Sequence, residues 1–246
     1  MKYRIALFDL DDTLTESKQP VSDEMVTHFT NLLAVMPVAI VSGAKFEQQL
    51  NQFINHLPKD ANFKNLYSFP QSAAQCLAFD GNSWVEQYTF AMTEVETTKI
   101  INALNSVLEE TKILEGQPSY GERIENRGAQ VTLSALGQEA PVDLKHAFDP
   151  DGAKRKDLKS RLDLLLPEYE VSIGGGTSID ITKKGINKTY SIKWLSEKLS
   201  VPISEMVYIG DALFAGGNDA VVIQTGIQTM ETKGPKETME IIDSLI

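Results

Sequence analysis

The sequence predicts an α/β protein: a parallel β-sheet with helices on both faces, interrupted by an inserted α+β unit. Near both ends of the chain, short apolar runs alternate with amphipathic stretches, which is typical of parallel strands joined by covering helices. The middle of the chain instead combines helical patterns with strands of alternating faces, which is typical of an antiparallel sheet. We therefore expect a core from residues 1–82 and 185–246 and an inserted domain from residues 83–184.

The two core segments contain runs of strand-like and helix-like residues in alternation. The first segment predicts a strand at Ile5–Phe8, a helix capped by Ser22 with Met25, Phe29 and Leu32 on one face, a strand at Val38–Val41 and a helix marked by Phe46, Leu50 and Phe53. The second predicts a helix with Ile192, Leu195 and Leu199 on one face, a strand at Val207–Ile209 and a short β-type run at Val221–Gln224.

The inserted segment contains patterns for both helices and antiparallel strands. It predicts a long helix with Ile100, Leu104, Val107 and Leu108, a strand at Val131–Ser134, a charged helix around Lys154–Leu166, and strands near Tyr169–Ile173 and Ser178–Thr182. This mixture is what an independent α+β layer needs, because its strands must bury one face and its helices must cover that face.

Composition excludes several classes of protein. The chain has 246 residues and a formal charge of −11, which argues against a polyanion-binding surface, so neither nucleic acid nor an anionic membrane is expected as a partner. Its longest apolar run, Leu32–Val41, is too short to span a bilayer. The lone cysteine, Cys76, cannot form an internal disulfide, which favours a reducing, cytoplasmic location.

Two acidic residues directly follow the first predicted strand. Asp9 and Asp11 are two positions apart, so their side chains point to the same side where the strand ends. Ligands of open α/β sheets bind at that carboxyl end. Two close carboxylates repel each other unless a proton or a cation is present, and Mg²⁺ prefers such oxygen ligands. The alternative is a solvated acidic turn.

Three more features follow apolar runs or begin helices. Ser42 and Gly43 could hold a phosphate oxygen or could simply cap a helix. Lys188 begins a helix, where a cation opposes the helix dipole and needs a nearby anion, unless it is a solvated surface lysine. Gly210-Asp211 and Gly216-Gly217-Asn218-Asp219 could complete a metal site or form a polar glycine loop.

Taken in order, these motifs resemble the haloacid dehalogenase-like (HAD) phosphohydrolase superfamily, subfamily IIB. The four motifs are Asp9-Leu10-Asp11-Asp12-Thr13, then Ser42, then Lys188, then Gly210-Asp211 with Asn218-Asp219. Within it, the chain is similar to eukaryotic-type phosphomannomutases in Ser178-Ile179-Asp180-Ile181, in Lys184-Gly185-Ile186-Asn187-Lys188-Thr189 and in the spacing of 210–219. The resemblance implies a Rossmann-like core and a type-two (C2) cap.

The resemblance also implies a Mg²⁺-dependent enzyme with assigned residue roles. Asp9 would attack phosphorus and form an aspartyl-phosphate, and Asp11 would transfer the protons. Mg²⁺ would bind to Asp9, the Asp11 backbone carbonyl and Asp211, with Asn218 and Asp219 orienting that shell. Ser42, Gly43 and Lys188 would hold phosphate oxygens.

Residues of the inserted domain are candidates for contacts to a sugar or its distal phosphate. They are Arg123, Arg127, Ser178 and Asp180, although Arg123 also fits a surface role. Two positions depart from the phosphomannomutase pattern. Lys18, which is a further candidate for contact with the substrate phosphate, stands where the family has a core arginine, and Gln138 stands where it has a second cap arginine. Neither residue replaces a bidentate guanidinium.

We expect a phosphatase for a small phosphosugar, because lost guanidinium groups weaken a mutase more than a hydrolase. The alternative is a phosphomannomutase-like phosphotransferase that interconverts mannose 6-phosphate and mannose 1-phosphate. A phospho-accepting signalling module is a third reading, but it gives no reason for the long insertion. A homodimer is kept as a candidate assembly.

Overall fold

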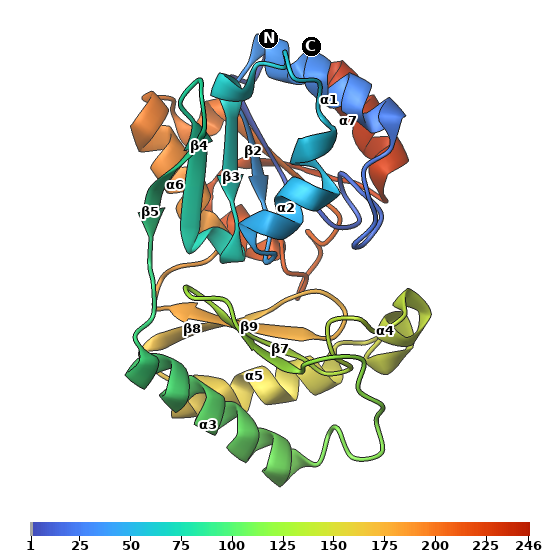
Figure 1. Ribbon diagram of the computed structural model, residues 1–246, viewed down its shortest axis with the longest axis vertical. Coiled ribbons are helices and arrows are strands. Elements are labelled where there is room, and N and C mark those ends of the chain that lie inside the picture. The colour runs from blue at the N-terminus through green and yellow to red at the C-terminus, as the bar shows by residue number, and fades with distance from the viewer. Residues whose placement is uncertain (1) are drawn as a thin grey trace. The chain divides into compact units, whose positions relative to one another are not determined.

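A seven-stranded sheet organises the two ends of the chain, and a four-stranded sheet organises its middle (Figure 1). The computed structural model describes residues 2–246. The chain divides into a larger unit, Met1–Thr89 with Lys188–Ile246, and a smaller unit, Phe90–Asn187. The structure thus has an α/β fold with an inserted α+β unit, as predicted.

The larger unit alternates strands and helices along the chain. Its strands are β1 (Ile5–Phe8), β2 (Val38–Val41), β3 (Leu66–Phe69), β4 (Gln75–Phe79), β5 (Trp84–Thr89), β10 (Met206–Gly210) and β11 (Gln228–Glu231). Its α-helices are α1 (Asp23–Val35), α2 (Phe46–Gln52), α6 (Lys188–Leu199) and α7 (Pro235–Leu245). Short 3₁₀ helices lie at Ile54–His56, Phe63–Asn65, Gln71–Ala73, Ile203–Glu205 and Ala220–Thr225.

The strand order is β11-β10-β1-β2-β3-β4-β5. The strands from β11 to β3 are parallel, while β4 and β5 run antiparallel. Strand β1 therefore lies between β2 and β10, and the carboxyl ends of all three meet at one edge of the sheet. This order brings three segments that are far apart in sequence to the same edge.

Helices cover both faces of the larger sheet (Figure 1). Helices α1 and α7 lie side by side on one face, where Phe29, Leu32 and Ile242 are fully buried. On the opposite face, α6 buries Ile192 and Leu195 against residues of β1 and β10. Because β1, β2 and β10 are buried on both faces, each of them reads as a nearly continuous apolar run in the sequence, whereas the edge strand β11 is mostly exposed and polar.

The predicted cap of α1 is present and explains where that helix begins. The side chain of Ser22 accepts a hydrogen bond from the backbone N–H of Met25 at 3.2 Å. A serine oxygen in this position satisfies one of the free N–H groups of the first turn, and Asp23 adds a negative charge where the helix dipole favours one. The helix then continues along the predicted apolar face to Val35.

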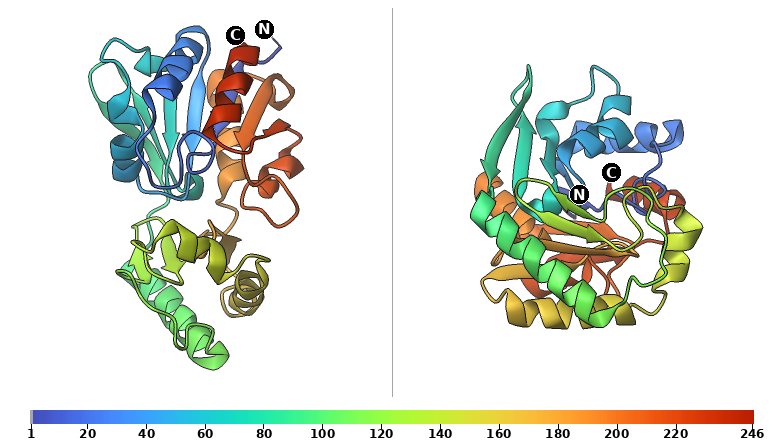
Figure 2. Two further views of the ribbon diagram at one scale, coloured as in Figure 1. Left: turned by 90° about the vertical axis from the view of Figure 1, so that its right-hand side faces the viewer. Right: turned by 60° about the horizontal axis from the view of Figure 1, so that its bottom comes forward.

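The smaller unit is a four-stranded antiparallel sheet, ordered β6-β7-β9-β8, with helices packed on one face. Its elements are α3 (Glu94–Thr111), β6 (Ile124–Asn126), β7 (Val131–Ser134), α4 (Val142–Phe148), α5 (Ala153–Leu165), β8 (Tyr169–Ile173) and β9 (Ser178–Lys183). Figure 2 shows α3 and α5 side by side over this sheet. Within residues 2–246, no helix has the length and apolar character needed to cross a membrane.

Two details of the predicted organisation are wrong. The predicted β-type run Val221–Gln224 lies in the 3₁₀ helix Ala220–Thr225, and the strand of this region is β11, which follows that helix. An apolar run of three residues, Val221–Ile223, cannot by itself distinguish a turn of helix from a strand. The strand β5, at residues 84–89, belongs to the larger sheet and not to the insert, because it pairs with β4 as an antiparallel hairpin.

Candidate active site

Three carboxylates meet at the carboxyl edge of the larger sheet. Asp9 follows β1, Asp211 follows β10, and Asp219 lies on the loop after β10; their carboxylate oxygens lie within 4.8 Å of one another. Hydrogen bonding fixes the first of these positions, since the Asp9 N–H donates to the carbonyl oxygen of Ile209 at 3.0 Å. The neighbouring strand ends thus bring together Asp9 and Asp211, as the sequence predicted.

The ammonium group of Lys188 lies beside these carboxylates. The Nζ atom of Lys188, the first residue of α6, lies 2.8 Å from Asp9 Oδ1 and 2.7 Å from Asp219 Oδ1. Its side chain is only 6 % exposed, so both ion pairs are largely shielded from water. The two carboxylates compensate for an ammonium at a helix N-terminus, where the helix dipole disfavours it.

Asp219 is more deeply embedded than a residue that only orients metal-bound water. Its side chain is fully buried and accepts hydrogen bonds from Lys188, from the Tyr208 hydroxyl at 2.5 Å and from the Ala212 N–H at 3.3 Å. Gly210 leaves room for it, because a Cβ at that position would collide with Asp219 Oδ2. Asp219 therefore anchors Lys188 within the carboxylate cluster.

Burial and mutual repulsion perturb the titration of these groups. Burial and the carboxylates of Asp219 and Asp211 hold the pKa of Asp9 well above its ordinary value, although Lys188 opposes them. Burial, followed by Asp219, raises the pKa of Asp211 to about 6. Burial opposes the charge on Lys188, but Asp219 and Asp9 outweigh it and raise the pKa of the ammonium. The cluster thus has more negative charge than Lys188 neutralises.

The donor set fits a divalent cation. Three carboxylates surround a single ammonium, and hard oxygen ligands suit a cation such as Mg²⁺ or Ca²⁺. The side-chain oxygen of Asn218, next to Asp219 in the chain, is buried and has no hydrogen-bond partner within residues 2–246. A buried oxygen acceptor beside excess carboxylate charge is the chemistry that a cation or its bound water would satisfy.

Ser42 and Gly43 follow β2, next to β1 at the same edge of the sheet. Ser42 is buried, its N–H donates to the Phe69 carbonyl at 3.1 Å, and its Oγ accepts from the Ala44 N–H at 3.1 Å. Because Oγ acts there as an acceptor, its proton remains suited to donation toward a phosphate oxygen. Phosphate binding by Ser42 and Gly43 stays a prediction.

The carboxylate of Asp11 does not join the cluster of Asp9, Asp211 and Asp219. Its Oδ1 accepts hydrogen bonds from the Lys18 N–H at 2.7 Å and from Gln52 Nε2 at 2.8 Å. The expected metal ligand at this position is the backbone carbonyl, which stays a prediction. The side chain of Lys18 is exposed, so its predicted phosphate contact also stays a prediction.

Candidate substrate residues of the smaller unit lie on its sheet, in the loop before β6 and in the turn between β6 and β7. Asp180 and Ser178 share one face of β9; Asp180 Oδ1 accepts from Gln130 Nε2 at 2.9 Å and from Thr132 Oγ1 at 2.8 Å. Arg127 Nε pairs with Glu125 at 2.8 Å. Arg123 donates to the carbonyl oxygens of residues 117 and 118, which is a loop-bracing role.

Sequence reasoning missed two residues at the edge of the larger sheet. Tyr208 lies within the apolar strand β10, where an aromatic residue is normal in a core, so no sequence signal distinguished it. Gln52 ends α2 as one of several polar residues on a short helix, and only its burial marks it. Both act through long-range contacts that the local pattern cannot reveal.

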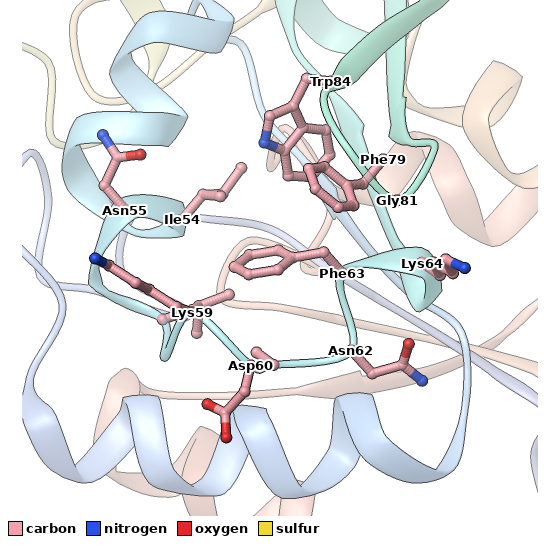
Figure 3. A pocket seen from close by; sticks show the side chains of 12 residues that line it. Ile54, Asn55, Lys59, Asp60, Asn62, Phe63, Lys64, Phe79, Gly81 and Trp84 are labelled. Atoms are coloured by element: carbon pink, nitrogen blue, oxygen red, sulfur yellow. The ribbon is translucent and has the colours of Figure 1, made fainter.

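A cavity of about 730 Å³ lies at the opposite, amino end of β3 (Figure 3). Phe63, Phe79 and Trp84 form much of its wall, with Lys59 also in the lining, and their rings contact one another edge-on or tilted. It contains none of the predicted site residues. The cavity is therefore separate from the carboxylate cluster.

Comparison with solved structures agrees with this fold. An IMP-nucleotidase of Plasmodium falciparum has a similar structure, with a TM-score of 0.72 at 18 % identity over 99 % of this chain and 68 % of that one. A haloacid dehalogenase-like hydrolase from Bacteroides thetaiotaomicron has a TM-score of 0.63 at 14 % identity, covering 99 % of this chain and 100 % of that one. At such identities the likeness shows the fold alone.

The carboxylate–lysine cluster on this fold defines an enzyme of the haloacid dehalogenase-like superfamily, a phosphotransferase or phosphatase. Residues 25–246 match the sequence profile of the family described as "Eukaryotic phosphomannomutase", and the chain belongs to that family. It is 25 % identical to phosphomannomutase 2 of Dictyostelium discoideum over 98 % of this chain and 96 % of that protein. It is 26 % identical to a phosphomannomutase of Spinacia oleracea, over 96 % and 93 %.

Proposed function

We propose that this protein is a Mg²⁺-dependent phosphotransferase that interconverts mannose 6-phosphate and mannose 1-phosphate. The observation that carries the proposal is the family match over residues 25–246, together with relatives named phosphomannomutase that align over nearly their whole length. This support is stronger for the mutase than for the phosphatase that the sequence pattern favoured. Phosphosugar hydrolysis remains the second candidate, because Lys18 and Gln138 replace arginines of the family pattern.

In the proposed mechanism, Asp9 attacks the phosphorus atom while Asp11 protonates the departing sugar oxygen. The new bond joins an Asp9 carboxylate oxygen to phosphorus, and the bond from phosphorus to the sugar oxygen breaks. In the second transfer, Asp11 accepts the proton of the attacking hydroxyl, and the Asp9–phosphorus bond breaks. Attack by the free hydroxyl of a hexose monophosphate gives a hexose 1,6-bisphosphate, and transfer of its other phosphoryl group back to Asp9 releases the isomer. An attacking water instead gives inorganic phosphate.

The remaining residues of the larger unit orient the phosphoryl group. Lys188, held by Asp219, would stabilise charge on its oxygens, and Ser42 would donate a hydrogen bond. Asp9, Asp211 and the Asp11 backbone carbonyl would hold Mg²⁺, with Asn218 and Asp219 supporting that site. When bound, Mg²⁺ supplies positive charge that lets Asp9 approach an anionic phosphate. Arg123, Arg127, Ser178 and Asp180 stay predicted sugar or distal-phosphate contacts.

The competing outcomes are separated by following both products at once. Mannose 6-phosphate and glucose 6-phosphate are incubated with enzyme and Mg²⁺, with and without added hexose 1,6-bisphosphate, and ³¹P NMR records the isomers and inorganic phosphate. With bisphosphate, we expect isomer formation at least about tenfold faster than phosphate release, which is a difference of about 1.4 kcal/mol between the two barriers. Faster phosphate release would identify a phosphatase instead.

A matched variant tests the missing guanidinium. Gln138→Arg restores the charge at a position where the family has arginine, so we expect it to raise the ratio of isomer formation to phosphate release. Glu139→Gln is the control, because it alters an exposed neighbouring side chain without adding a guanidinium. An unchanged ratio in Gln138→Arg would mean that this position does not select between the two reactions.

Binding of Mg²⁺ at this site is expected to stabilise the folded protein more at neutral pH than at acidic pH. In the metal-free protein, folding raises the pKa of Asp211 from 3.8 to about 6. The protonated carboxyl group of Asp211 therefore stabilises the folded protein. This contribution to the free energy of unfolding is complete below about pH 4 and is lost as pH rises through about 6. The loss is of order 1–3 kcal/mol, because Asp211 is partly exposed.

Thermal unfolding with and without Mg²⁺ checks this prediction. We expect Mg²⁺ to raise the melting temperature by more at about pH 7.5 than at about pH 5, because protons compete with the metal for the carboxylates. In the Asp211→Asn variant the side chain at this position cannot ionise, so most of the difference in Mg²⁺ stabilisation between the two pH values should disappear. Equal stabilisation at both pH values, or stabilisation of Asp211→Asn as large as that of the wild type, would contradict a metal site here.

The other expectations from the sequence stay predictions. A phosphosugar substrate is supported by the family match, whereas the absence of nucleic-acid and membrane partners, the homodimer and the cytoplasmic location rest on composition and resemblance.

A further inference from the structure

A buried glutamine amide holds the carboxylate of Asp11. Gln52, the last residue of α2, is 5 % exposed, and its Nε2 donates to Asp11 Oδ1 at 2.8 Å. The Lys18 N–H donates to the same oxygen at 2.7 Å. The side chain that the proposed mechanism uses for proton transfer is thus fixed by two donors, and one of them comes from a distant segment.

The orientation of the Gln52 amide is itself determined. Its Nε2 also donates to Thr15 Oγ1 at 2.6 Å, and its Oε1 accepts from Gln48 Nε2 at 3.1 Å. The amide nitrogen therefore faces two oxygen acceptors, while the amide oxygen faces a donor. A flipped amide would place its oxygen against the carboxylate of Asp11 and would lose the hydrogen bonds with Asp11 and Gln48.

The main chain of Gln52 secures the same loop from its other end. The Gln52 carbonyl oxygen accepts a hydrogen bond from the Val21 N–H at 2.9 Å. The side chain contacts Asp11 and Thr15 at the beginning of the loop after β1, and the carbonyl contacts Val21, which precedes the N-cap residue of α1. The end of α2 therefore fixes both ends of the segment that carries Asp11.

We propose that Gln52 is a positioning residue that orients Asp11 for proton transfer to and from the sugar oxygen. This inference rests on the proposed function, in which Asp11 is the general acid and base. Proton transfer requires the carboxyl group within hydrogen-bond distance of the reacting oxygen, and a side chain free to rotate spends less time there. No step of the mechanism requires Gln52 to touch the substrate.

Leaving groups of different basicity provide the test. Gln52→Leu removes the amide while keeping a similar size, and we expect it to lower kcat for a hexose phosphate about 10- to 100-fold with a smaller change in KM. Release of p-nitrophenolate from p-nitrophenyl phosphate in the first turnover should change less than about threefold, because this leaving group needs no protonation. A general structural defect would lower both rates together.

Gln49→Leu is the matched control. Gln49 lies on the same helix and is also fully buried, but its Oε1 accepts from Ser68 Oγ at 2.5 Å, with Ser68 on β3. Thermal unfolding should show a loss of stability in both leucine variants, because each leaves a buried partner without its hydrogen bond. Only Gln52→Leu should change the ratio of hexose phosphate to p-nitrophenyl phosphate rates.

A double-mutant cycle completes the design. In an Asp11→Asn background, Gln52→Leu should cause no further loss on the hexose phosphate, because the group it positions is gone. Losses that multiply, or equal losses on both substrates, would overturn the proposal. The proposed function is judged separately on the wild type: if it turns over no hexose phosphate, that proposal fails, and the cycle is repeated with whichever alkyl phosphate the wild type hydrolyses.

Discussion

Asp9→Asn is expected to lower the rate of phosphoryl transfer by about 10⁴-fold or more and to leave the fold intact. Asp9 provides the attacking oxygen in the proposed mechanism, and an amide is a poor nucleophile that cannot replace it. The structure adds an expectation about stability. Asp9 is one of three clustered carboxylates and its pKa is raised by burial, so removing its charge relieves repulsion while Lys188 keeps its ion pair with Asp219.

Two measurements check this expectation on the same samples. Product formation from mannose 6-phosphate gives the rate, and thermal unfolding without metal at about pH 7.5 should give a melting temperature no lower than that of the wild type. Asp60→Asn, which alters an exposed aspartate, should match the wild type in both. Phosphoryl transfer that persists in Asp9→Asn would remove Asp9 from its role, and a large drop in melting temperature would contradict the repulsion.

Lys188→Met is expected to damage both the fold and the activity. Lys188 is buried and pairs with Asp9 and Asp219, so its removal leaves these carboxylates without their cation. Breaking a buried ion pair on one side typically costs about 3–5 kcal/mol. The phosphoryl oxygens would also lose the charge that stabilises them, so we expect at least a 100-fold loss of rate, on the order of a removed oxyanion donor.

Denaturant unfolding and activity assays at saturating Mg²⁺ measure the two effects of Lys188→Met. Lys193→Met is the matched control, because Lys193 is exposed on the same helix, α6, and should change stability by less than about 0.5 kcal/mol. Asp219→Asn removes the charge of one carboxylate that pairs with Lys188 but keeps the ammonium group. It therefore tests the effect of this ion pair apart from the loss of the cation. A Lys188→Met protein as stable as its Lys193→Met control would contradict the buried pairing.

The predicted elements were most accurate where burial leaves a clear local pattern. Val38–Val41, Val131–Ser134 and Tyr169–Ile173 are strands with the predicted bounds, because strands buried on both faces are continuously apolar and half-buried strands alternate. Val221–Gln224 has a similar pattern and folds into a 3₁₀ turn. That helix ends at Gly226 in the left-handed conformation, and three apolar residues do not by themselves specify a strand there.

The hairpin of β4 and β5 shows a second limit. Trp84 pairs with Phe79 and contacts Phe63, so an aromatic cluster attaches β5 to the larger sheet. Cross-strand pairs of this kind stabilise a sheet, but they depend on the partner strand, which the sequence of residues 84–89 does not specify.

The residue pattern is sufficient to predict that acidic residues, a serine and a lysine follow apolar strands or begin a helix, because local patterning shows which ends of the strands carry polar side chains. The ion pair of Asp219 with Lys188 and the hydrogen bond from Gln52 to Asp11 are visible only in the folded chain. Those contacts join segments separated by 31 and 41 positions, and their geometry depends on how α6 and α2 pack beside the sheet edge. The residue pattern of a strand or helix indicates which of its faces is buried, whereas a hydrogen bond between distant segments forms only when folding brings both partners together.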